Sequence, residues 1–258
     1  MTEHAHGGVP IDAVLVLVAV VAVAGYLGGV RSSRARGRPW PRHRAVLWVV
    51  GIAAACASVA GPLAHAAHDD FVAHMATHLL AGMLAPLLLV LAAPVTLALR
   101  TLDVVPARRL SRLLGSFPAR LVAHPVTAAV LSAGGLWVIY STPLFSWMQA
   151  SPLVHLTVHA HLLAAGFLFT AAFVGVDPRP HRMPRAWLAA ILVLSTASHS
   201  ILAKHLYGHP PTGVPDAAAQ AGAEFMYYGG GAVEAAIMVL FCARWYRAAG
   251  RRMAAAPA

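Results

Sequence analysis

The stretch FVAHMATHLLAGMLAPLLLVLAAPVTLALR, residues 71–100, decides the fold of this chain. After its second histidine it contains no charged residue until Arg100. A helix needs about 20 predominantly apolar residues to cross the hydrocarbon core of a bilayer. The stretch therefore predicts a membrane-spanning helix whose first two turns carry His74, Met75 and His78.

The rest of the chain repeats this apolar pattern. Only 11% of its residues are charged, whereas a soluble domain carries about a quarter. Strand-like alternation is absent, and lipid admits only helices or closed barrels. The sequence predicts an all-α, polytopic membrane protein, a bundle of seven transmembrane helices. The seven predicted spans are 11–30, 45–64, 71–99, 122–143, 153–175, 185–206 and 217–243.

The arginines predict how the bundle is oriented. All of them lie in or beside the gaps after the first, third and fifth spans, or in the C-terminal tail. Cytoplasmic loops carry such an excess, so we expect the N-terminus outside and the C-terminus in the cytoplasm, in a multi-pass protein of the cell membrane. The net charge of +10 does not indicate nucleic-acid binding, because it is confined to these short gaps.

The domain organisation follows from the spans. The N-terminus has no basic region before its first apolar run, so we interpret that run as a retained span and not a signal peptide. We expect an extracytoplasmic tail at 1–10, a seven-span membrane domain at 11–247, and a disordered cytoplasmic tail at 248–258.

Histidines gather at the outer end of the bundle, where twelve of the fifteen are expected. Residues four apart share a helix face, which pairs His74 with His78 and His155 with His159. At 1.5 Å per residue, the third, fifth, sixth and seventh spans bring imidazoles and one carboxylate to similar depth. Imidazole and thioether groups together suit copper. The candidate metal ligands are His74, His78, His155, His159, His199, Glu224, Met75 and Met226.

Two observations keep other interpretations open. A histidine near a membrane interface also occurs without a ligand, with one end of its ring in water. Glu234 lies in the middle of the seventh span, where a charged side chain costs about 2.5–3.5 kcal/mol. We expect it to face the bundle and to be protonated or partnered, in either a functional or a structural role.

Several segments carry a likeness to a known family. The most specific is HMATHLLAGMLAPLLLVLAAPVTLALR (74–100), followed by HPVTAAVLSAGGLWVIYSTPLF (124–145), SPLVHLTVHAHLLAAGFLF (151–169) and the segment 220–231. In these the chain resembles the seven-helix CtaG family of cytochrome c oxidase assembly factors. The resemblance implies a role in maturing heme–copper oxidases, by supplying copper to the oxidase. Tyr140 departs from the pattern, since family members often have histidine there.

The sequence thus favours a non-enzymatic assembly factor that binds copper through outer-leaflet histidines and delivers it to cytochrome c oxidase. Its partners would be oxidase subunits and the bilayer, and a homo-oligomer stays open. Two alternatives remain: a membrane transporter of copper or another small solute, and a protein that holds heme b between histidines of two helices. A rhodopsin is excluded, because Lys204 is the only lysine and lies outside the last span.

Overall fold

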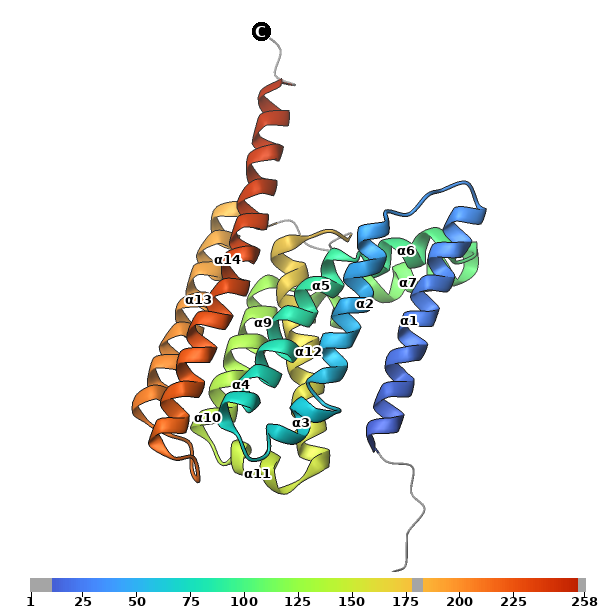
Figure 1. Cartoon of the computed structure of the whole chain (residues 1–258). Coiled ribbons are helices and arrows are strands. Elements are labelled where there is room, and N and C mark those ends of the chain that lie inside the picture. Colours follow the sequence, from blue (N-terminus) through green and yellow to red (C-terminus); the bar gives the residue numbers. More distant parts are fainter. Residues whose placement is uncertain (1–10, 178–182, 255–258) are drawn as a thin grey trace, which may run out of the picture.

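The computed structural model describes residues 11–177 and 183–254 (Figure 1). Within these ranges the chain is helical and contains no strand. Among the described residues, six helical stretches are long and apolar enough to cross a membrane, and the number rises to seven if one bent pair of helices is counted as a single span. The predicted all-α, multi-pass membrane fold is therefore confirmed. The tail 1–10 with its two histidines, the segment 178–182 and the last residues 255–258 lie outside the described residues.

The first half of the bundle contains three spans. The first is α1 (Ile11–Ala35), and the second combines α2 (Arg42–Ala57) with the short α3 (Pro62–Ala66). The third is assembled from four pieces, which are α4 (Phe71–Leu79), the π-helical turn η1 (Leu80–Leu84), α5 (Ala85–Leu91) and α6 (Pro94–Thr101).

The second half begins with two short helices outside the spans, α7 (Val104–Leu114) and α8 (Phe117–Val122). The fourth span is α9 (Pro125–Ala129), the π-helical turn η2 (Val130–Gly134) and α10 (Gly135–Ser141), followed at an angle of 78° by α11 (Leu144–Ala150). The last three spans are α12 (Pro152–Val174), α13 (Arg185–Gly208) and α14 (Asp216–Ala254).

Helical structure also extends well beyond the predicted spans, most clearly in two parts of the chain. The segment between the predicted fourth and fifth spans, which end at 143 and begin at 153, contains α11. The last helix continues to Ala254, well beyond the predicted end of the span at 243. Apolar periodicity does not mark either limit, because α11 is only 7 residues long and the end of α14 is rich in alanine and arginine, which are good helix formers.

The third span is interrupted where its sequence contains proline. Pro86 has no backbone N–H and its ring clashes with a carbonyl one turn earlier in a regular helix. The wider turn η1 ends two residues before Pro86. Ala93 adopts a left-handed conformation, with φ of 55°, directly before Pro94. The span therefore bends at defined points.

Glycines let the central helices approach closely. A Cβ atom on Gly166 of α12 would overlap with the carbonyl of Gly82 in η1, so the two backbones touch there. A Cβ atom on Gly222 would collide with Phe71 of α4, and one on Gly230 would overlap with the His199 ring of α13. Small residues at helix crossings are typical of membrane bundles. Here they place α4, α12, α13 and α14 around one core.

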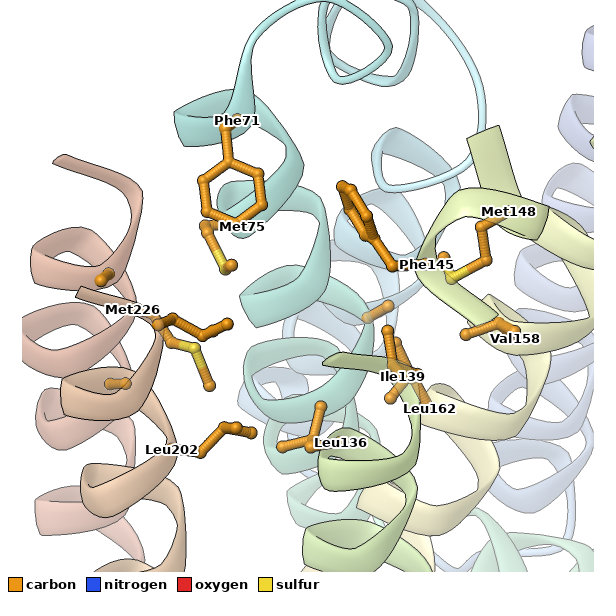
Figure 2. Close-up of a cluster of buried hydrophobic side chains, with 14 residues drawn as sticks. Phe71, Met75, Leu136, Ile139, Phe145, Met148, Val158, Leu162, Leu202 and Met226 are labelled. Atoms are coloured by element: carbon orange, nitrogen blue, oxygen red, sulfur yellow. The ribbon is translucent and has the colours of Figure 1, made fainter. Parts of the chain in front are cut away.

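Two ends of the bundle can be distinguished in Figure 1. We call the end formed by α3, α11 and the α13–α14 loop the histidine end, and the opposite one the arginine end. At the arginine end α7 carries three arginines among mostly apolar residues, with Val104 and Val105 exposed. Near the histidine end an apolar cluster joins α4, α10, α12, α13 and α14, with Phe71, Met75 and Met226 among its members (Figure 2).

Candidate functional site

The first two turns of α4 bring two histidines into the interior. The Asp70 side chain accepts a hydrogen bond from the Val72 backbone N–H at 2.8 Å and caps the helix. His74 and His78 follow on one face, and each is only 3% exposed. The predicted spacing of four residues thus places both rings inside the bundle.

The second pair lies on α12. Ser151 caps this helix, and the rings of His155 and His159 stack with their centroids 4.2 Å apart. His68, in the loop after α3, stacks on the His155 ring at 5.5 Å. The three imidazoles form a column that runs from the loop into the bundle.

The protonation of His159 can be inferred from its hydrogen bond. Its Nδ1 lies 3.1 Å from the backbone carbonyl of His155. A carbonyl only accepts, so Nδ1 must carry the hydrogen, and the neutral ring then has a lone pair on Nε2. That Nε2 atom is buried and has no hydrogen-bond partner. This arrangement is the usual one for a metal-binding histidine.

Tyr140 connects two of the candidate ligands. Its hydroxyl lies 3.2 Å from Nε2 of His74 and donates to the sulfur of Met75 at 3.6 Å. If the phenol proton points to sulfur, the Nε2–H of His74 donates to the phenol oxygen, which leaves the lone pair on Nδ1. The Nδ1 atom of His74 is buried without a partner. The residue that departs from the expected family pattern is therefore in direct contact with the predicted site.

A third group lies deeper in the bundle. His199 of α13 and Glu234 of α14 are 5% and 6% exposed, and Nδ1 of the imidazole lies 3.5 Å from a carboxylate oxygen. With His78 they line a cavity of about 40 Å³. Residues of both π-helical turns, Met83 and Ser132 among them, line the same cavity.

The structure brings most of the predicted ligands together. His78 and His199 line one cavity, and the rings of His155 and His159 are in contact. Met75 and Met226 are fully buried in the apolar cluster between α4 and α14 (Figure 2). In the described part of the chain, however, no three histidine, cysteine or acidic side chains surround one point as metal ligands.

Glu224 lies apart from the other predicted ligands. It is exposed on α14 and lines a surface groove with Lys204, Tyr227 and Tyr228. Glu234, and not Glu224, lies beside a buried imidazole, that of His199. The sequence does not reveal that Glu234 lies beside a histidine, although Gly230, one turn before it, indicates that this face of α14 packs closely.

The fold and these contacts define a class of protein, a multi-pass helical membrane protein with a buried histidine cluster near one end. The chain matches the family described as cytochrome c oxidase caa3 assembly factor (Caa3_CtaG) over residues 24–248 and belongs to that family.

Similar proteins come from mycobacteria. The chain is 37% identical over 180 residues to the uncharacterized protein Mb0105 of Mycobacterium bovis. The aligned region covers 67% of this chain and 27% of the relative. It is 34% identical over 190 residues to the uncharacterized protein ML1998 of Mycobacterium leprae, covering 71% and 28%. The chain therefore spans about a quarter of the length of these relatives. No solved structure matches it.

Proposed function

We propose that this protein is an integral membrane assembly factor for cytochrome c oxidase that binds copper through its buried histidines and passes it to the oxidase. The assembly role follows from the family. The copper role rests on one observation above all. Five buried histidines, on α4, α12 and α13, each keep a ring nitrogen without a hydrogen-bond partner.

Such nitrogens are unfavourable unless something binds them. A buried polar atom without a partner costs about 1–3 kcal/mol, and five of them lie in one region of the bundle. A metal ion that accepts their lone pairs would remove this cost. Neutral imidazoles with nearby thioethers suit copper, and thioethers favour its reduced form, Cu(I). The buried sulfur atoms of Met75 and Met226 supply that preference.

The distribution of arginine supports an orientation for the site. The loops and helix ends at the arginine end carry the basic side chains that mark a cytoplasmic face. The histidine end, and with it the N-terminus, then faces the outside of the plasma membrane. His65 and His68 lie exposed at this end, where they can take up copper or release it to a partner.

Delivery requires that copper be bound but not enclosed. The candidate ligands are spread over several helices, and among the described residues no three histidine, cysteine or acidic groups surround one point. The column from His68 to His159 gives neighbouring rings in contact along a path to the surface. We therefore propose a non-catalytic role in which the ion moves between neighbouring imidazoles to the oxidase.

The two alternatives make different demands on the bundle. A heme requires a space of the order of hundreds of Å³, whereas the cavity beside His78 and His199 measures about 40 Å³. A transporter of cations would require acceptors at the arginine end as well. A small ion that is bound and released at the histidine end fits the structure better than either alternative. An optical spectrum of the purified protein tests the heme alternative, because bound heme gives an intense Soret band.

The copper role is tested by anaerobic titration of the full-length protein with Cu(I) against a coloured chelator. Replacing His74 and His159 together by alanine should remove tight binding at this cluster. His161→Ala is the matched control, because His161 lies on α12 but is exposed on another face. A double variant that binds Cu(I) as the unaltered protein does would refute the ligand assignment.

A further inference from the structure

The cavity lined by His78, His199 and Glu234 has the features of a built site. All three side chains are less than a tenth exposed. Each has a buried polar atom without a hydrogen-bond partner: Nε2 of both histidines and Oε2 of Glu234. The volume of about 40 Å³ leaves room for a small ligand, since a single water needs about 10–15 Å³ on this measure.

The Glu234 carboxylate is close to one nitrogen of the His199 ring. Nδ1 of His199 is the atom beside the carboxylate, at 3.5 Å. When the carboxylate accepts the Nδ1 hydrogen, the lone pair of the neutral ring is on Nε2. A carboxylate that accepts a hydrogen bond from the second ring nitrogen commonly supports a histidine that binds metal. It also makes the imidazole a better electron-pair donor to the metal.

The local backbone maintains the arrangement. A Cβ atom on Gly230 would overlap with the His199 ring, so only glycine lets α14 lie this close to it. Both π-helical turns border the cavity through Met83 and Ser132, and such turns are frequent at functional sites. Met83 adds a thioether to the lining.

Charge distinguishes this cavity from the outer histidines. His74 contacts a phenol, and His155 and His159 contact a carbonyl and neighbouring rings. The deeper cavity instead contains a carboxylate. A buried charge is costly unless it is compensated. One carboxylate balances one positive charge, so a monovalent ion leaves the site neutral while a divalent ion does not.

We propose that this cavity is a second, inner site for a monovalent transition-metal ion, with His78 and His199 as imidazole ligands and Glu234 as the compensating carboxylate. The identity of the ion as Cu(I) rests on the proposed function. The protein would then hold copper at two levels, an outer one open to exchange and an inner one that retains the ion.

The experiment is an anaerobic Cu(I) titration of the full-length protein in detergent, with a chelator that resolves two affinities. We expect about two equivalents, one at each level, and a loss of affinity at the inner one of about 10–100-fold in Glu234→Gln, as for other supporting groups. Glu234→Asp keeps the charge and should restore much of the affinity. Asp216→Asn, an exposed acid on the same helix, is the matched control.

The outcomes separate the two proposals. If Glu234→Gln keeps every equivalent at unchanged affinity, the inner site is refuted while copper binding stands. If the unaltered protein binds no Cu(I), the proposed function fails. If the unaltered protein binds only one equivalent in total and Glu234→Gln loses it, the inner site is supported and the outer one is refuted. Thermal unfolding and gel filtration of each variant show that it is folded, and X-ray absorption of bound copper, with Met83→Leu for comparison, reports its ligands independently.

Discussion

Histidine occurs in two different environments in this bundle, in the outer column and in the inner cavity. His155 and His159 stack on each other, and His68 continues the column to an exposed loop. His199 instead lies between a glycine and a carboxylate, away from any loop. Stacked neutral rings near a surface suit an ion that must leave. A ring fixed by a buried carboxylate suits an ion that must stay.

The largest effect should come from the glycine that admits the His199 ring. Gly230→Ala places a methyl group where that ring lies, and overpacking of this kind costs about 1–3 kcal/mol. We expect a lower midpoint of thermal unfolding and loss of the inner copper equivalent, with the outer one kept.

Gly231→Ala is the matched control for this change, because a Cβ atom there meets nothing within 4 Å. Both variants replace glycine by alanine in the same helix. Equal copper affinities and equal unfolding midpoints in the two would contradict the close contact between α14 and His199.

A smaller effect should follow at the outer level from Tyr140→Phe. The change removes the hydroxyl that connects His74 with Met75. Loss of a group that orients a ligand typically weakens metal binding by about 10–100-fold. We expect a loss near the lower end of this range at the outer site and no change at the inner one, measured in the same Cu(I) titration.

Tyr228→Phe controls for loss of a phenol, since Tyr228 is exposed on α14. If Tyr140→Phe weakened the inner site and left the outer one intact, the division of the histidines into two levels would be wrong.

The smallest effect should come from Glu224→Gln. The sequence predicts Glu224 as a ligand, but its side chain is exposed in a groove beside Lys204. We therefore expect Cu(I) affinity to change less than twofold, well under the 1.4 kcal/mol that corresponds to a factor of ten. A loss as large as that of Glu234→Gln would mean that this face of α14 turns toward the histidines when metal binds.

The sequence was sufficient for the helical class and for most of the spans. Apolar length identifies a membrane helix, and the spacing of four places His74 with His78 and His155 with His159 on common faces. These four residues are buried as expected. Such signals are local, so they can be recognised without the tertiary structure.

The contacts between distant residues could not be derived in this way. Hydropathy alone does not show which face of α14 turns inward, so Glu224 was predicted as the carboxylate and the position of Glu234 beside His199 was missed. The contact of Tyr140 with His74 joins residues 66 positions apart. It depends on how α10 packs against α4, and the spacing of residues within one helix does not predict such packing.

The π-helical turn η1 has a consequence for how the third span can change. A π turn contains one residue more than an α turn, which rotates all that follows by about 100° about the helix axis. The histidine-bearing α4 packs against α14, while α5 packs against α2 and α12. The extra residue therefore lets α4 and α5 each turn a different face toward their own neighbours. Removing one residue from Leu80–Leu84 would therefore leave each half well formed, yet point the imidazoles at the wrong neighbours.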